Sequence, residues 1–308
     1  MQVSGQSSSS SEPGNVTDEE LEVEMKSRIR IPVVLLAILL CFGAACTLLG
    51  GGNVAVDLMK KVPVDSTSFS YWAVGDIDAD QELWEIFAIF NNSTEADQVM
   101  DTGLALSIVR HSAKASGFEG LTTNAAKVLT GEFDVNDTER RLEREQYTKS
   151  TYQEIGIWTP PEGLGFSPIA VQEGTFLIGD EESLKLCIDV KVKDDVSSLY
   201  DNPNVKLVVD KLPDGIIVNV WIATADSEEK YEDLVAYGRS YRKVEEGMLE
   251  LTAVYMFQAG FSAGNAQDAI KDYLGTKKFN DIKVERDDSF IRATARIYVS
   301  DSVAFLVY

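Results

Sequence analysis

A serine between two glycines is the residue best placed for covalent chemistry. Gly260-Phe261-Ser262-Ala263-Gly264 fits the G-x-S-x-G pattern, in which a serine on a sharp strand-to-helix turn attacks a carbonyl carbon. Such a serine needs a base within hydrogen-bond reach, normally a histidine that comes later in the chain. The only histidine is His111, far upstream of the serine. We therefore expect a non-catalytic turn here, with Asn265 capping the helix that follows.

Paired carboxylates are the other groups that support hydrolysis. Adjacent acids occur at Asp194-Asp195, Glu228-Glu229 and Asp287-Asp288. Acids that cleave glycosidic bonds must face each other across a cleft, and a chain with 50 acidic residues contains many pairs that do not. Ser262 and these pairs define an alternative function, a membrane-anchored hydrolase. No catalytic set is complete, so the sequence favours a protein that is not an enzyme.

Metal-binding patterns are also incomplete. Asp76-Ile77-Asp78-Ala79-Asp80 begins like a calcium loop, but Gln81 and Phe87 stand where such loops need glycine and glutamate. We expect these acids to cap a helix that starts at Glu82. Cys187 has apolar neighbours and is predicted to be a buried thiol. Since one histidine and one such thiol do not make a usual zinc site, we predict no metal and no cofactor.

The clearest signal in the chain is an apolar run near its start. Residues 31–49 carry no charge, and a hydrocarbon core of about 30 Å needs about 20 such residues in a helix. Lys26, Arg28 and Arg30 precede the run. Basic residues on this flank hold the N-terminal end in the cytoplasm. We therefore expect a cell-membrane protein, single-pass or lipid-anchored, whose C-terminal part is extracytoplasmic.

Two interpretations of residues 31–52 stay open. They form either an uncleaved signal anchor or a lipoprotein signal segment that begins at Met25. Gly43-Ala44-Ala45-Cys46 resembles a bacterial lipobox, although that pattern usually has leucine at the place of Gly43. Cys46 is then the candidate for lipid attachment. Residues 1–30 are expected to be a disordered acidic tail with a basic flank.

The charge of the chain limits its partners. The formal net charge is −22, and most of it belongs to residues 62–308. Nucleic acid is excluded as a partner, because its phosphates demand a basic surface. The predicted partners are the membrane, through the N-terminal helix, and an envelope protein or small ligand.

The second half of the outer part repeats features of the first. Val62-Pro63 and Leu212-Pro213 each precede a predicted strand that ends at a tryptophan. We therefore predict an internal duplication. Its first lobe spans residues 62–211 and its second lobe residues 212–308.

Short turns between strands indicate the fold class. Glu173-Gly174 is predicted to join strands at 166–172 and 175–178 as a hairpin. A helix is expected at 137–147 with Asn136 as its cap, and two or three strands at 282–308. We predict an α+β fold, in which each lobe has a mixed or antiparallel sheet with helices packed on one face.

Several short motifs accompany this pattern. Val62-Pro63-Val64-Asp65 fits a VPxD start, Gly131-Glu132-Phe133-Asp134 fits GxFD, and residues 179–184 fit GDxxSL. With the apolar N-terminal run, they resemble a bacterial family of membrane-anchored envelope proteins of unknown function. The resemblance covers about residues 60–220 and departs at Tyr152 to Trp158, where the glycine is displaced. It implies a duplicated α+β fold and an envelope location, and it carries no catalytic residues.

Overall fold

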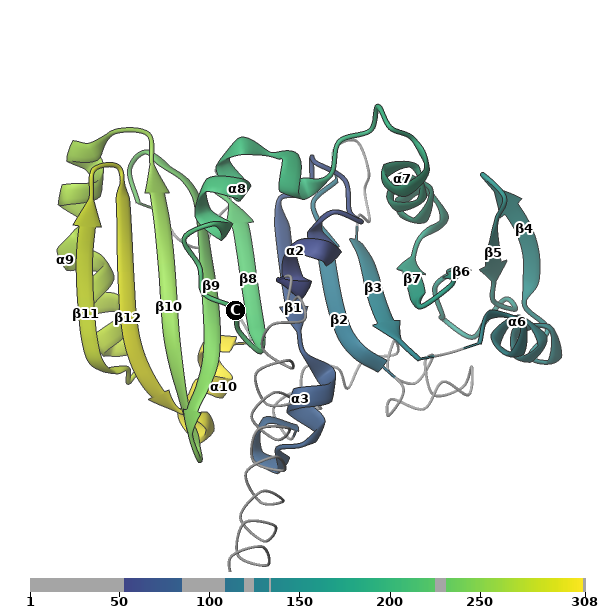
Figure 1. Ribbon diagram of the computed structural model, residues 1–308, viewed down its shortest axis with the longest axis horizontal. Helices are drawn as coiled ribbons and strands as arrows, with labels where there is room; N and C mark the ends of the chain where they lie inside the picture. The colour runs from purple at the N-terminus through teal and green to yellow at the C-terminus, as the bar shows by residue number, and fades with distance from the viewer. Residues whose placement is uncertain (1–52, 85–108, 119–124, 133, 225–230, 307–308) are drawn as a thin grey trace, which may run out of the picture. The chain divides into compact units, whose positions relative to one another are not determined.

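A computed structural model describes residues 53–84, 109–118, 125–132, 134–224 and 231–306 (Figure 1). The N-terminal tail, the apolar run at 31–49, Cys46 and the pair Glu228-Glu229 lie outside the described residues. Within the described part, no helix combines the length and the apolar character needed to cross a bilayer.

The described strands form one antiparallel sheet of twelve. Their order in space is β11-β12-β10-β9-β8-β1-β2-β3-β7-β6-β5-β4. The first seven along the chain are β1 (Ser68–Trp72), β2 (Val109–Ser116), β3 (Ala125–Gly131), β4 (Thr148–Tyr152), β5 (Ile155–Thr159), β6 (Ile169–Gln172) and β7 (Thr175–Gly179). The others are β8 (Ile217–Ile222), β9 (Leu234–Glu245), β10 (Met248–Phe257), β11 (Asn280–Asp287) and β12 (Phe290–Tyr298).

Helices cover both faces of this sheet. One core contains residues of α2 (Val54–Met59), α7 (Glu181–Val192) and α8 (Pro203–Val209). The other contains residues of α3 (Val74–Asp78), α6 (Val135–Arg144), α9 (Gly260–Thr276) and α10 (Val299–Leu306). In Figure 1, α2 and α8 lie in front of the sheet and α9 behind it.

The expectation of helices on one face is therefore wrong, although the α+β class is confirmed. The physical reason lies in strands such as β6 and β7, in which every residue is buried. A strand that buries both of its faces needs a covering layer on each side.

The two halves of residues 62–308 share one sheet in the described part of the chain. β1 of the first half pairs with β8 of the second, and Ser70 lies opposite Asn219 at the middle of the five paired positions. The Ser70 hydroxyl donates to Asn219 Oδ1 at 2.5 Å. Along the chain, both halves contain three strands, a helix and two strands: β1-β2-β3-α6-β4-β5 and β8-β9-β10-α9-β11-β12. In the sheet, the β6–β7 hairpin lies between β3 and β5, whereas β10 pairs directly with β12.

Local signals predicted some elements well and others less well. The β6–β7 hairpin turns at Glu173-Gly174, with Gly174 at φ 63°, as expected. Helix α6, however, is capped by the Asp134 side chain, which accepts from the Asp137 amide at 2.8 Å, so Asn136 is not the cap. The expected last strand is helix α10, and Asp301 in its first turn suits the positive end of the helix dipole.

Candidate functional site

Ser262 lies inside a helix and not on an exposed turn. Helix α9 begins at Gly260, directly after the extended Ala259, so Asn265 is an exposed residue within the helix and caps nothing. The Ser262 side chain is 2% exposed and its hydroxyl donates to Asp233 Oδ2 at 2.7 Å. A substrate carbonyl cannot reach a hydroxyl that is buried and already bonded to a carboxylate.

The histidine is far from this serine. His111 lies on β2, where its Nδ1 is 3.1 Å from the Tyr71 hydroxyl and its ring stacks on the tyrosine ring. Helix α9 packs on β10, β11 and β12. Four strand spacings separate β2 from β10, which is about 19 Å at about 4.8 Å each. His111 is therefore too far away to serve Ser262 as a base.

The other candidate groups do not converge on a cleft. Asp194 and Asp195 are both exposed after α7, and Asp287, at the end of β11, pairs with Lys211 at 3.4 Å. Cys187 is 1% exposed, and its burial raises the pKa of the thiol to about 12. The described ranges contain no group of three or more His, Cys, Asp or Glu side chains able to hold a metal ion.

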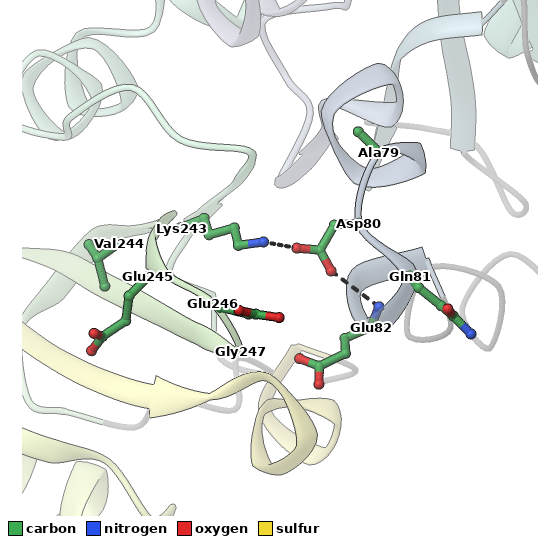
Figure 2. A pocket seen from close by; sticks show the side chains of 9 residues that line it. All are labelled: Ala79, Asp80, Gln81, Glu82, Lys243, Val244, Glu245, Glu246 and Gly247. Carbon is green, nitrogen blue, oxygen red and sulfur yellow. Dashed lines mark hydrogen bonds and ion pairs between the residues drawn. The ribbon is translucent and has the colours of Figure 1, made fainter.

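One pocket lies where residues that follow α3 approach the turn between β9 and β10 (Figure 2). Its volume is about 990 Å³. The lining residues are Ala79, Asp80, Gln81, Glu82, Lys243, Val244, Glu245, Glu246 and Gly247. Two segments more than 150 residues apart in the chain thus build one pocket, which we call the junction pocket.

An ion pair crosses the junction pocket. The Asp80 carboxylate faces the Lys243 ammonium and bonds to it, and it also accepts from the Glu82 amide at 3.1 Å (Figure 2). Asp80 Oδ1 accepts from the Leu83 amide as well, at 3.2 Å. The hydrogen bond from Lys243 is the largest cause that lowers the pKa of Asp80. The same bond raises the pKa of Lys243.

The junction pocket is polar, with four carboxylates and one ammonium group among its lining side chains. Asp80 caps the helical turn at 81–84, as the sequence predicted, whereas Asp76 and Asp78 lie exposed on α3. The sequence alone did not single out Lys243. Only the register of β9 brings this lysine to Asp80, so no local pattern marks it.

Comparisons with known proteins identify the fold only. No family model matches the sequence, and no curated protein matches it. Crystal forms III and IV of TP0453 superpose with TM-scores of 0.52 and 0.51. Both are 7% identical in sequence to this chain. Each superposition covers 81% of this chain, and the two cover 97% and 96% of the TP0453 chain, respectively. At this identity, the likeness defines a shared α+β fold with a large antiparallel sheet and nothing about activity.

Proposed function

We propose that this chain is a non-catalytic binding protein of the cell envelope, held at a membrane by its N-terminal segment. The uncharged residues 31–49 and the basic residues before them support the tether and its orientation. A signal anchor or a lipid on Cys46 provides the attachment, and the intact mass of the membrane form distinguishes the two.

One observation carries the non-catalytic part of this proposal. Ser262, the residue with the strongest catalytic pattern, is buried in the first turn of α9 and bonded to Asp233. An activated serine requires a base within about 3 Å and access for a substrate. The side chain of Ser262 has neither a histidine base nor an open cleft beside it.

The junction pocket supports the binding part. Ligand pockets commonly have volumes of about 300–1,000 Å³, and this open, polar pocket has a volume of about 990 Å³. Its walls come from residues 79–82 and from the β9–β10 turn, so a ligand bound there contacts both predicted lobes. The excess of carboxylates favours a partner that presents a cationic group.

The orientation is tested with a protease tag fused after Tyr308 on the full chain. External protease is expected to remove the tag from intact cells, because the proposal places this end outside. A tag that survives in intact cells and is digested only after lysis contradicts the extracytoplasmic location.

The absence of serine chemistry is tested with a fluorophosphonate probe, which labels activated serines covalently. The folded chain is expected to remain unlabelled. Labelling that disappears in Ser262→Ala and persists in the control Ser289→Ala favours the hydrolase instead.

We also propose that the two halves are related copies of one β-β-β-α-β-β unit. Helices α6 and α9 end alike: Gln146 has φ 63° and Lys278 has φ 64°. The next amides, of Tyr147 and Phe279, donate to the carbonyl oxygens of Leu142 and Leu274 at 3.0 and 3.2 Å.

Glycine tests this likeness because it adopts positive φ without steric cost. Gln146→Gly and Lys278→Gly are each expected to raise the free energy of unfolding by about 0.5–1 kcal/mol, measured by urea denaturation. If one substitution stabilises the chain and the other destabilises it, the two helix ends are not equivalent.

A further inference from the structure

Two lysines reach the turn end of the β6–β7 hairpin from neighbouring helical segments. Lys61 follows α2, and Lys191 lies in the last turn of α7. Lys61 Nζ donates to the Thr175 hydroxyl at 3.0 Å, and Lys191 Nζ donates to Gln172 Oε1. Gln172 and Thr175 lie directly opposite each other on β6 and β7, so their side chains project to the same face. The register of the hairpin therefore brings the two ammonium groups together.

The electrostatics of Lys61 agree with this placement. Burial is the largest cause that lowers the pKa of Lys61, and the charge of Lys191 lowers it further. Asp57 opposes both effects, but its carboxylate pairs with Lys60 at 3.1 Å. Within the described ranges, neither Lys61 nor Lys191 forms an ion pair. Their printed partners are both neutral, so the two positive charges add.

The two neutral partners present only donors to a ligand. Gln172 is 8% exposed and Thr175 is 5% exposed. Because an ammonium group can only donate, each of these side chains uses its oxygen to accept from a lysine. The Gln172 amide nitrogen and the Thr175 hydroxyl proton remain as donors, and neither meets an acceptor among the described residues. Buried polar groups normally have partners, so these donors favour an acceptor from outside the chain. We call Lys61, Gln172, Thr175 and Lys191 the hairpin cluster.

A pocket adjoins the hairpin cluster where two strands separate. β5 and β6 pair at two positions, Ile157–Ala170 and Trp158–Ile169. Beyond them, residues 154–156 on one side and residues 171–172 on the other line a pocket of about 460 Å³. Gln172 and Lys191 both belong to this lining. The volume is within the range of small-molecule sites.

The charges in this pocket balance except at the hairpin cluster. Glu139 and Lys149, both in the lining, pair with each other at 2.8 Å. The other carboxylate is Glu154, which is exposed in the turn between β4 and β5. Glu173, in the turn of the β6–β7 hairpin, is also exposed. The cationic side of the pocket is therefore the one that Lys191 shares with Lys61.

We propose that the hairpin cluster binds the carboxylate or phosphate group of a small polar organic anion, whose remaining part lies in the adjoining pocket. Both ammonium groups, the Gln172 amide nitrogen and the Thr175 hydroxyl donate to the anionic oxygens. Charge-assisted hydrogen bonds of this kind are stronger than those between neutral groups. This inference names a ligand class for the binding protein proposed above and rests on that proposal.

The test observes one of the donors directly. The full chain is prepared in detergent micelles with ¹⁵N in its glutamine side chains, and the Gln172 signal is assigned by its loss in Gln172→Met. Inorganic phosphate and acetate are the probes, and chloride at equal ionic strength is the reference. A saturable shift of the Gln172 amide signal is expected with at least one probe, and the probe with the higher affinity identifies the anionic group.

Variants of the cluster measure what each part contributes. Lys61→Gln/Lys191→Gln is expected to bind the preferred probe at least about tenfold more weakly, which corresponds to about 1.4 kcal/mol. Thr175→Val removes one donor at nearly constant shape and is expected to weaken binding about threefold to tenfold.

A matched control separates a site from general charge screening. Lys206→Gln/Lys271→Gln removes the same charge from exposed helix positions and is expected to bind as the wild type does. Circular dichroism checks that all variants remain folded.

Three results overturn the inference: no saturable shift with either probe, equal shifts with chloride, or equal affinities of the two double-lysine variants. If the tag at Tyr308 is still digested from outside and the serine probe still fails to label, only this ligand class is rejected and the proposed function stands.

Discussion

At the scale of single residues, burial controls which side chains can react. The Ser262 hydroxyl is enclosed and donates a hydrogen bond to Asp233. The Cys187 thiol has a pKa of about 12 because burial disfavours the thiolate, so the nucleophilic form is absent at neutral pH. Lys114, in contrast, projects from the middle of a strand and is exposed. The accessible charged groups, and not the nucleophiles, are therefore the ones available for binding.

His111 is expected to make the stability of the fold depend on pH. Desolvation is the largest cause that lowers the pKa of His111, Arg110 lowers it further, and Asp76 opposes both. The unfolded chain then binds its proton first, at a pKa of about 6.5. Stability should be complete above that pH and should decrease as pH falls toward the folded pKa.

This dependence can be assigned without ambiguity because the chain has a single histidine. Proton NMR of the folded chain should give a histidine pKa below 6.5, and urea unfolding should show the decrease. In His111→Gln, the part of the stability decrease that comes from protonation of this histidine should be absent. A folded pKa at or above the ordinary value would be incompatible with the burial of this ring.

Asp80 has two roles that substitutions can separate. It caps the turn at 81–84 and pairs with Lys243. Asparagine caps helices about as well as aspartate, whereas alanine does not. Asp80→Asn removes only the ion pair and should therefore lower the free energy of unfolding by about 0–1 kcal/mol. Asp80→Ala also removes the cap and should lower it by about 1 kcal/mol more. Urea denaturation at pH 7 measures both, and equal losses in the two variants would mean that the cap contributes nothing.

At the scale of elements, sequence reasoning succeeded where the deciding residues are close in the chain. Asp80 caps the helical turn at 81–84 through Leu83, three residues on, and Gly174 turns the β6–β7 hairpin. The pairing of the two halves shows the opposite case. Ser70 and Asn219 meet only because β1 pairs with β8, and no local pattern gives that register.

The packing of α8 on the sheet depends on a glycine in β9. A Cβ at Gly238 would lie 2.8 Å from Leu212 Cδ1 and 2.9 Å from Val208 Cγ1, both closer than real contacts allow. Gly238→Ala should therefore lower the free energy of unfolding by about 1–3 kcal/mol. Its control is Gly275→Ala in α9, where nothing lies within 4 Å and alanine should stabilise the helix by up to about 1 kcal/mol.

Urea denaturation of the two glycine variants gives the comparison. The opposite signs matter more than the magnitudes, because both substitutions add the same methyl group. If Gly238→Ala were neutral, α8 would have room to move away from β9 at no cost.

At the scale of the whole molecule, one sheet contains the strands of both predicted lobes, and residues 53–308 form one compact unit. Both cores combine residues from both halves: one includes Val128 and Val220, and the other includes Ile178 and Ile297. The boundary at 211/212 followed from the repeated Val62-Pro63 and Leu212-Pro213, which mark where each half begins. Such a repeat locates the start of a unit, but it says nothing of which strand of one unit pairs with which strand of the other.

Because the halves share their cores, β7 of the first half and β10 of the second should unfold together. Hydrogen exchange of the full chain in increasing urea, read by mass spectrometry on peptides from these strands, should give one midpoint for both. Separate lobes would instead release one strand at a lower urea concentration than the other. Two midpoints would mean that the five β1–β8 residue pairs and the shared cores are too weak to couple the halves. The junction pocket, built from residues 79–82 and 243–247, would then be a contact between independently folding units and not a fixed pocket.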